Sequence, residues 1–230
     1  MCERKSILVI LFLWAILHVS CSKEDFTKPA VVQFEFQLNM EENEGKFLKF
    51  EQGDFIFNTI EFEGERETGG DVFFVSPFDD PVVADLDQKT VNQSVDFDIP
   101  QGIYQRITIT FEKEETVDEP TVKYVGIYSS AKKVDIPVIV EINLNEAIEV
   151  KAESVSGGNE IVLKEETPST AEITLDPVFM FQLVNSRTLE SADITEVDGV
   201  STIVINENSN EVIYDRLIDR LEKSTFAVFK

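Results

Sequence analysis

The sequence predicts a mainly β protein with an antiparallel, sandwich-like or barrel-like core, a short helix and a C-terminal amphipathic helix. Apolar and polar residues alternate with a period of two over many short segments, the pattern of strands with one buried face. Turn residues separate these segments at short intervals. Hydrophobic residues make up 43% of the chain, so a core can form despite a formal net charge of −24.

The predicted strands begin in the segment that follows Val31, where Val32, Phe34 and Phe36 alternate with polar residues. The segment 54–65 repeats this alternation, and Pro77 bounds one of the apolar runs that follow. Further strands are expected at 72–75, 82–86, 95–99, 103–111, 121–128, 132–143, 147–155, 160–163, 170–175 and 226–229.

The last part of the chain, residues 176–230, carries the helix signals. Asp176 followed by Pro177 is typical of a helix start, and we expect a short helix that ends near Val184. Asn208 and Glu211 have the spacing of a capping box. The apolar residues that come after it share one helical face: Ile213, Tyr214, Leu217, Ile218 and Leu221. We expect this helix to pack on the sheet of a single domain, 31–230.

Residues 1–20 have the layout of an export signal. Arg4 and Lys5 are followed by an almost wholly apolar run, 7–19, and then by Ser20 and Cys21. Thirteen apolar residues are too few for a helix that spans a bilayer, which needs about 20. The segment is therefore predicted to be a processed signal rather than part of the fold.

Cys21 directly follows the apolar run, and this arrangement resembles a bacterial lipoprotein signal. In such signals the cysteine is lipidated and becomes the first mature residue, so residues 21–30 would be an acylated cysteine and a polar tether. The usual leucine three residues before the cysteine is replaced by His18, and Leu17 lies one place further back. The alternative is ordinary secretion, but 18–20 fits a small-x-small cleavage site poorly.

Cleavage before Cys21 would remove whole classes of chemistry from the mature protein. His18 and Trp14 are the single histidine and tryptophan of the chain, and Cys2 is the other cysteine. Without them, no Ser-His-Asp triad, Cys-His pair or Cys/His zinc site can be built. A disulfide within the mature chain is excluded as well. The absence of a basic block argues against a nucleic-acid partner.

Carboxylate pairs are the remaining catalytic candidates, as in glycoside hydrolysis. The chain has 44 Asp and Glu residues, so close pairs arise by chance, and no motif marks one of them. Glu61, Glu63 and Glu65 share one strand face, which we interpret as the solvated face. We assign no catalytic residue, and a carboxylate-only hydrolase is kept as an alternative.

Calcium is the only metal for which the sequence offers ligands, and we assign no metal site. Four tracts supply carboxylate or amide oxygens, but none has the spacing of a twelve-residue calcium loop. These tracts are Asp79-Asp80, Asp85-x-Asp87, Asp96-x-Asp98 and Asn206–Asn208. They are more simply explained as strand faces and turns, and no cofactor is expected.

Tyrosines are the candidate ligand contacts, because sugar sites stack aromatic rings against the apolar face of the sugar. Tyr104 lies opposite the predicted core face, and Tyr124 and Tyr128 share another predicted strand. We expect these three side chains to be exposed. Tyr214 lies in the apolar stripe of the predicted helix and is assigned to the core.

Several phrases resemble uncharacterised β-rich surface lipoproteins of Bacteroidetes-type bacteria. These phrases are SCSKED at 20–25, IEFEGERE at 60–67, FDIPQGIY at 97–104 and the ending 209–229. The resemblance implies a lipid anchor at Cys21 in the outer membrane. It also implies that Lys23, Glu24 and Asp25 act as a signal for export to the cell exterior. The family has no established active site, so no catalytic residue can be transferred.

These observations together predict a lipid-anchored protein of the outer membrane that faces the cell exterior. Its expected role is non-enzymatic: binding, adhesion or structure at the cell surface. One alternative is an accessory glycan- or nutrient-binding lipoprotein, and the other is the carboxylate-only hydrolase. The expected partners are the membrane, through the lipid at Cys21, and a surface glycan or protein.

Overall fold

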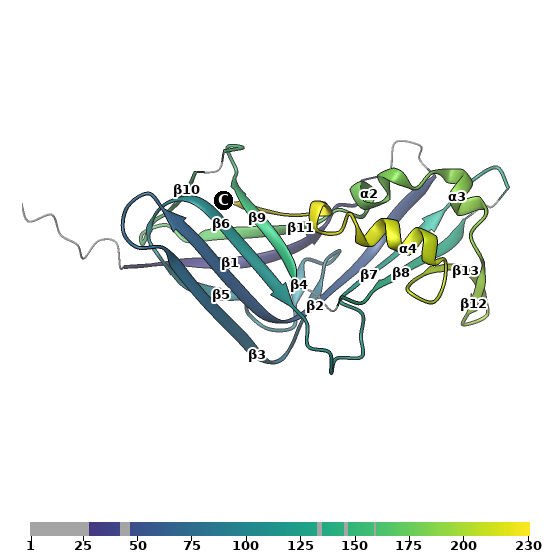
Figure 1. Cartoon of the computed structure of the whole chain (residues 1–230), viewed down its shortest axis with the longest axis horizontal. Coiled ribbons are helices and arrows are strands. Elements are labelled where there is room, and N and C mark those ends of the chain that lie inside the picture. Colours follow the sequence, from purple (N-terminus) through teal and green to yellow (C-terminus); the bar gives the residue numbers. More distant parts are fainter. Residues whose placement is uncertain (1–27, 42–46, 133–134, 145–146, 159) are drawn as a thin grey trace, which may run out of the picture.

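The structure is a computed structural model and describes residues 28–41, 47–132, 135–144, 147–158 and 160–230. The chain is mainly β, as predicted, and its strands form one large sheet with a few short helices (Figure 1). The strands are β1 (Pro29–Leu38), β2 (Leu48–Arg66), β3 (Val72–Asp85), β4 (Thr90–Val91), β5 (Asp96–Pro100), β6 (Gly102–Glu112), β7 (Val122–Tyr128), β8 (Ile136–Ile142), β9 (Ile148–Ser154), β10 (Ile161–Leu163), β11 (Ser169–Leu175), β12 (Thr195–Val197), β13 (Val200–Ile205) and β14 (Thr225–Phe229).

The sheet is mixed rather than purely antiparallel. Its path runs β12-β13-β8-β7-β2-β6-β9-β14-β11-β1-β5 and is not closed, with β3, β4 and β10 paired off this path. Most neighbours are antiparallel, but β1 pairs with β11, β13 with β8 and β14 with β9 in parallel. The sequence pattern predicts strands but not partners, so these long-range parallel pairings could not be anticipated.

β2 is the longest strand, and it connects the strands at one end of the molecule with those at the other end (Figure 1). Its first half pairs with β7, and its second half pairs with β6. β3 pairs in antiparallel fashion with the opposite edge of β2, from Asp54 to Gly64. Figure 1 shows β7, β8 and β13 at one end of the molecule and β1, β5, β6 and β10 at the other, with β2 extending between them.

Phenylalanine rings fill the core between the strands. Phe36 of β1 lies 5.4 Å from Phe57 of β2 and 5.9 Å from Phe111 of β6, measured between ring centroids. Phe57 and Phe111 are themselves 5.1 Å apart. The burial of β1 alternates along its length, as the period of two predicts. β1, near one end of the path, therefore packs across the core against β2 and β6, which lie near its middle.

The sequence divides β3 wrongly into two strands, 72–75 and 82–86. Pro77, which the sequence pattern predicts to be a strand boundary, lies inside β3, and so does Pro81. Proline is tolerated in a strand where its missing N–H would face no partner, as at an edge. Pro77 pairs with Thr59 of β2 on one side, and no strand of the described chain lies on the other side.

The helices are α2 (Pro177–Met180), α3 (Ser186–Glu190) and α4 (Glu211–Ile218), with 3-10 turns η2 (Phe181–Leu183) and η3 (Glu222–Ser224). They lie over the β7–β8–β13 end of the sheet (Figure 1). The predicted start of the short helix is confirmed, because Asp176 Oδ1 accepts a hydrogen bond of 2.8 Å from Phe179 N. Phe181 of η2 packs on Phe50 of β2.

The predicted capping box at Asn208 is wrong, because 206–209 form a tight turn closed by backbone hydrogen bonds between Asn206 and Ser209. Asn210 precedes α4 in a left-handed conformation, with φ of 55°. The side-chain nitrogen Nδ2 of Asn210 donates a hydrogen bond of 2.7 Å to Val204 O. α4 ends at Ile218, before the last residue of the predicted stripe.

Two further observations complete the fold. The final strand predicted at 226–229 is confirmed as β14, which lies between β9 and β11. Across the described ranges, no helix is long and apolar enough to cross a membrane.

Candidate functional site

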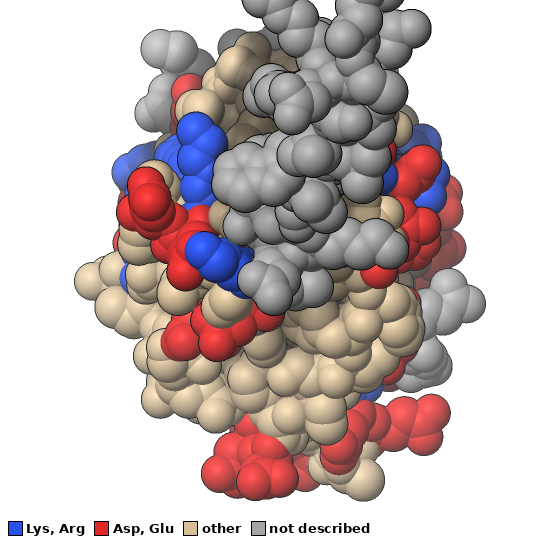
Figure 2. All heavy atoms as spheres, turned by 90° about the vertical axis from the view of Figure 1, so that its left-hand side faces the viewer, with Lys and Arg blue, Asp and Glu red and all other residues tan. Residues whose placement is uncertain are grey.

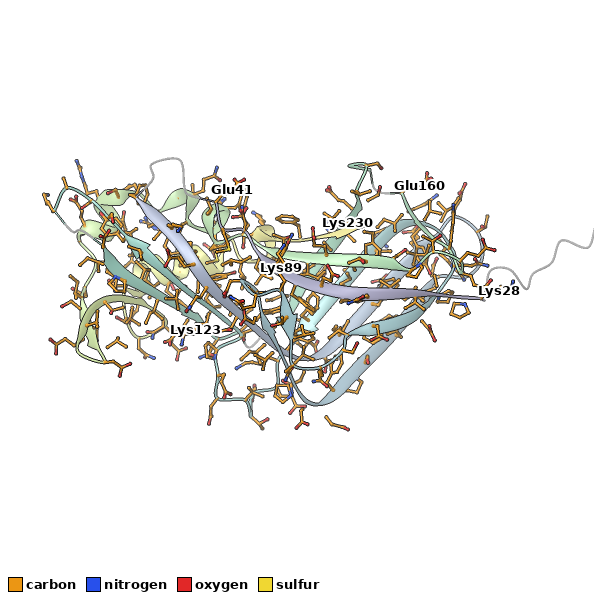
Figure 3. The ribbon with its side chains drawn as sticks, turned by 180° about the vertical axis from the view of Figure 1, so that it is seen from behind. Lys28, Glu41, Lys89, Lys123, Glu160 and Lys230 are labelled. Carbon is orange, nitrogen blue, oxygen red and sulfur yellow. The ribbon has the colours of Figure 1, made fainter. Side chains whose placement is uncertain are left out.

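The predicted lipid anchor lies outside the described residues. Cys21 and the export cluster Lys23, Glu24 and Asp25 all precede Lys28, the first residue that the structure describes. Figure 3 shows Lys28 at one tip of the molecule, with Glu160 and Lys230 towards the same end. The anchor and the export signal remain predictions from the sequence.

The three tyrosines proposed as ligand contacts are buried, so the prediction that they are exposed is wrong. Tyr104, Tyr124 and Tyr128 have no exposed surface. The Tyr104 hydroxyl donates to Pro100 O at 2.5 Å, and the Tyr128 hydroxyl donates to Ser186 O at 2.9 Å. These side chains hold strands and helices together and cannot stack on a ligand at the surface.

A bulge explains the inward position of Tyr104. Glu65 pairs with Arg106 of β6, whereas the next residue of β2, Arg66, pairs with Tyr104, so Gln105 is an extra residue. One extra residue moves the following side chains to the opposite face. The ring of Tyr104 then lies against Gly64, where a Cβ would approach its Cε1 to 2.5 Å. A glycine inside a strand pattern was the available signal.

Burial also changes the acidity of these tyrosines. It raises the pKa of Tyr104 to about 12, although the charge of Arg66 opposes the shift. Burial raises the pKa of Tyr124 further, and the charge of Asp176 adds to the shift. The Tyr124 hydroxyl is buried and has no hydrogen-bond partner within the described chain. Both groups stay protonated at neutral pH, which fits a structural role.

The four tracts lie on strands and in turns: Asp79-Asp80 belongs to β3 and Asp96-x-Asp98 to β5, whereas Asp85 and Asn206 close local turns. Asp87 Oδ1 accepts from Gly53 N, Asp85 Oδ1 accepts from Gln88 N, and the Ser94 hydroxyl bonds to Asp96. In the described part of the chain, no three His, Cys, Asp or Glu side chains are grouped so that they could hold a metal ion. No calcium site is therefore located among the described residues.

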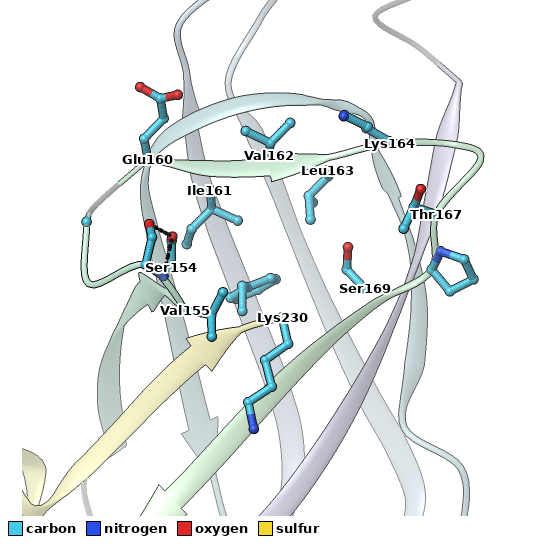
Figure 4. Close-up of a pocket in the computed structure, with 14 residues that line it drawn as sticks. Ser154, Val155, Glu160, Ile161, Val162, Leu163, Lys164, Thr167, Ser169 and Lys230 are labelled. Carbon is cyan, nitrogen blue, oxygen red and sulfur yellow. Dashed lines mark hydrogen bonds between the residues drawn. The ribbon is translucent and has the colours of Figure 1, made fainter.

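A pit of about 670 Å³ lies beside β10 (Figure 4). β10 crosses above it, while the ends of β9 and β14 and the start of β11 border it from below. Val155 and Val162 are exposed apolar side chains of its wall, and Lys164 and Lys230 also border it. The Lys230 ammonium points away from the pit and pairs with Glu172 at 2.7 Å (Figure 4). The polar part of the lining includes the carboxylate of Glu160 and the hydroxyls of Ser154, Ser156, Thr167 and Ser169. A pit of this composition suits a small amphipathic ligand.

A second cleft, of about 500 Å³, contains carboxylates in a partly apolar setting. Asp54, Asp80 and Glu119 line it together with Ile56 and Val83. Burial raises the pKa of Asp54 above its ordinary value, and the neighbouring charge of Asp85 raises it further. The sequence analysis missed this site. Its signal was a carboxylate between Gly53 and the apolar run 55–57.

Comparison with known proteins adds no constraint on these sites. No protein-family model, curated protein or solved structure matches the chain. The functional argument therefore depends on the sequence signals and on the geometry described above.

We expect the substitutions Tyr124→Phe and Tyr128→Phe to change stability in opposite directions. Tyr124→Phe removes a buried hydroxyl without a partner and should raise the free energy of unfolding by about 1 kcal/mol. Tyr128→Phe leaves Ser186 O without its donor and should lower it by about 1–2 kcal/mol. Urea denaturation measures both. Equal losses in the two variants would contradict this account of the two hydroxyls.

We expect Asp54→Asn to stabilise the protein at pH 7 more than at pH 3. The pKa of Asp54 is raised in the folded state, so its protonated form favours folding. The stabilisation by protonated Asp54 is present at pH values below 3.8, the ordinary pKa of the group. It is lost as the pH rises through the higher pKa of the folded state. Urea denaturation at the two pH values tests the sign, with exposed Asp79→Asn as the control for removing one charge. A larger gain at pH 3 would contradict it.

Proposed function

We propose that this protein is a lipid-anchored cell-surface protein of the outer membrane with a non-enzymatic binding, adhesion or structural role. The observation that carries the proposal is Cys21, placed directly after a thirteen-residue apolar run and before a polar segment. Several acyl chains on one cysteine would hold the protein at the membrane, because a single chain binds only marginally.

The distance from the anchor to the fold supports a position close to the membrane. β1 begins at Pro29, so seven residues separate the sheet from Cys21. Seven residues span at most about 25 Å when fully extended. Within this proposal, the end that carries β1 faces the lipid, and the β12–β13 end faces outward (Figure 1).

The architecture proposed for this protein is sandwich-like. Inward side chains of β1 meet those of β2 and β6 across the core, as the contact between Phe36 and Phe111 illustrates. The apolar residues of α4, Ile213 and Leu217, are buried, which supports packing of this helix on the sheet. A rigid β-fold of this kind is suited to presenting a surface to partners.

The two alternatives now have unequal support. Accessory glycan binding depended on exposed tyrosines, and Tyr104, Tyr124 and Tyr128 are buried. The carboxylate-only hydrolase is the second candidate, because Asp54 lines a concave cleft with two other carboxylates and has a raised pKa. A carboxyl group whose pKa is raised is what a general acid requires.

We expect metabolic labelling with an alkyne fatty acid to mark the wild-type protein and to fail with Cys21→Ala. The matched control is Cys2→Ala, which removes the other cysteine and should leave labelling intact. If Cys21→Ala protein is still labelled and sediments with membranes, the anchor proposal is wrong.

Replacing Lys23, Glu24 and Asp25 by alanine tests the export signal separately. We expect this variant to be acylated like the wild type but protected from protease added to intact cells. Unchanged cleavage by the protease would contradict the role of this cluster, and the labelling shows that the anchor itself is unaffected.

The hydrolase alternative is tested with a panel of aryl glycosides and the purified full chain. The binding proposal predicts no turnover above the uncatalysed rate. Turnover that falls by a factor of about 100 or more in Asp54→Asn, but not in Asp79→Asn, would replace it with the second candidate.

A further inference from the structure

β3 leaves one of its edges open. Along its other edge it pairs with β2 from Val72 to Asp85. On the open side, β4 reaches only Ala84 and Asp85, so no strand of the described chain pairs with 72–78 there. An open edge presents N–H and C=O groups that can pair with another extended chain.

Residues 72–78 of β3 form the open stretch, and they lack the features that keep most edge strands from pairing with another chain. Residues 72–78 contain no charged side chain, in a chain of which 28% is charged. Phe73 and Val75 point outward and are 64% and 49% exposed. Charged residues and bulges usually prevent edge-to-edge pairing. Pro77 marks the strand as an edge but leaves 72–76 available.

β5, the strand at one end of the sheet path, lies beside this part of β3. Phe74 of β3 lies 5.2 Å from Phe97 of β5 between ring centroids. β5 is the terminal strand of the sheet path, so its outer edge is also open within the described residues. Figure 2 shows an uncharged area below the charged rim of this end, on the side on which Figure 1 places β5 and β3.

Carboxylates surround the uncharged stretch. Asp71 precedes it, and Asp79 and Asp80 follow it. Asp96 and Asp98 flank Phe97 on β5, and all five side chains are exposed. None of them forms an ion pair with a described lysine or arginine. An apolar extended partner with basic ends therefore matches the charge of this edge.

We propose that the open edge of β3 binds an extended segment of another protein, apolar in its centre and carrying Lys or Arg at both ends. The segment adds a strand to β3 and places β-branched or aromatic side chains opposite Phe73 and Val75. Its basic ends lie near Asp71 and near Asp79-Asp80. The proposal rests on the proposed binding role and names its partner class.

A second copy of this chain is a poor occupant of the same edge. Each chain carries a formal net charge of −24, and pairing two β3 edges would bring their flanking aspartates together. Like charges at close range oppose association. The same negative charge attracts a basic partner and favours its binding.

The test uses the full chain, purified in a non-ionic detergent, and a labelled nine-residue peptide with a Thr-Val-Phe-Val-Thr centre and two lysines at each end. Fluorescence anisotropy measures binding, and hydrogen exchange locates it. We expect protection of the amides of 72–76 when the peptide is bound. An analogue that is N-methylated at alternate residues keeps its charge but loses backbone donors, and should bind at least about tenfold more weakly.

Two charge-matched variants separate edge pairing from general attraction to an acidic protein. Phe73→Glu should weaken binding at least about tenfold, whereas Val212→Glu should change it less than about twofold. Val212 lies on α4 and is 67% exposed, close to the 64% of Phe73. Val75→Glu provides a second variant of the edge.

Several results would overturn the proposal. These are no binding at about 1 mM peptide, equal weakening by Phe73→Glu and Val212→Glu, protection away from β3, or equal binding of a peptide with glutamate ends. Protection of β3 that depends on the concentration of the protein alone would assign the edge to a second copy. None of these results depends on acylation of Cys21, so the anchor proposal stands or fails separately.

Discussion

β2 is shared by both parts of the sheet, and its hydrogen bonds determine where the other elements lie. It pairs with β7 near its start, with β6 near its end and with β3 over its middle. One register shift lies inside its pairing with β7, between Phe50 and Gln52. At that shift Gly126 of β7 passes so close that a Cβ would lie 2.4 Å from Lys49 O. A side chain at position 126 would therefore collide with the backbone of β2, and this part of the pairing requires glycine.

The core and the surface of the protein use separate sets of residues. Phenylalanine supplies most of the aromatic contacts inside, and it brings no polar atom that needs a partner. Two of the buried tyrosines link elements, as Tyr128 links β7 to Ser186, whereas the Tyr124 hydroxyl has no partner within the described residues. No acidic residue of the described chain is buried, so the negative charge lies at the surface and in its clefts.

The sequence pattern predicted the strands well because alternation reports burial directly. It failed where burial depends on a distant partner. In β6 the bulge at Gln105 turns Tyr104 inward, and no local pattern marks its position. In β7 both faces are apolar, and only the helices above it decide which face is buried more deeply. The cleft around Asp54 was missed for the same reason, because its other carboxylates, Asp80 and Glu119, come from separate segments.

The parallel pairing of β1 with β11 has a consequence for how the chain folds. Gln37 and Thr174 bond to each other across 137 residues of sequence. Contacts this distant slow folding, because a long loop must close before they form. β1 is synthesised first, so its edge towards β11 has no partner until the last third of the chain is present. The sheet therefore cannot be completed from the N-terminus onward, and its assembly waits for the C-terminal strands β11 and β14.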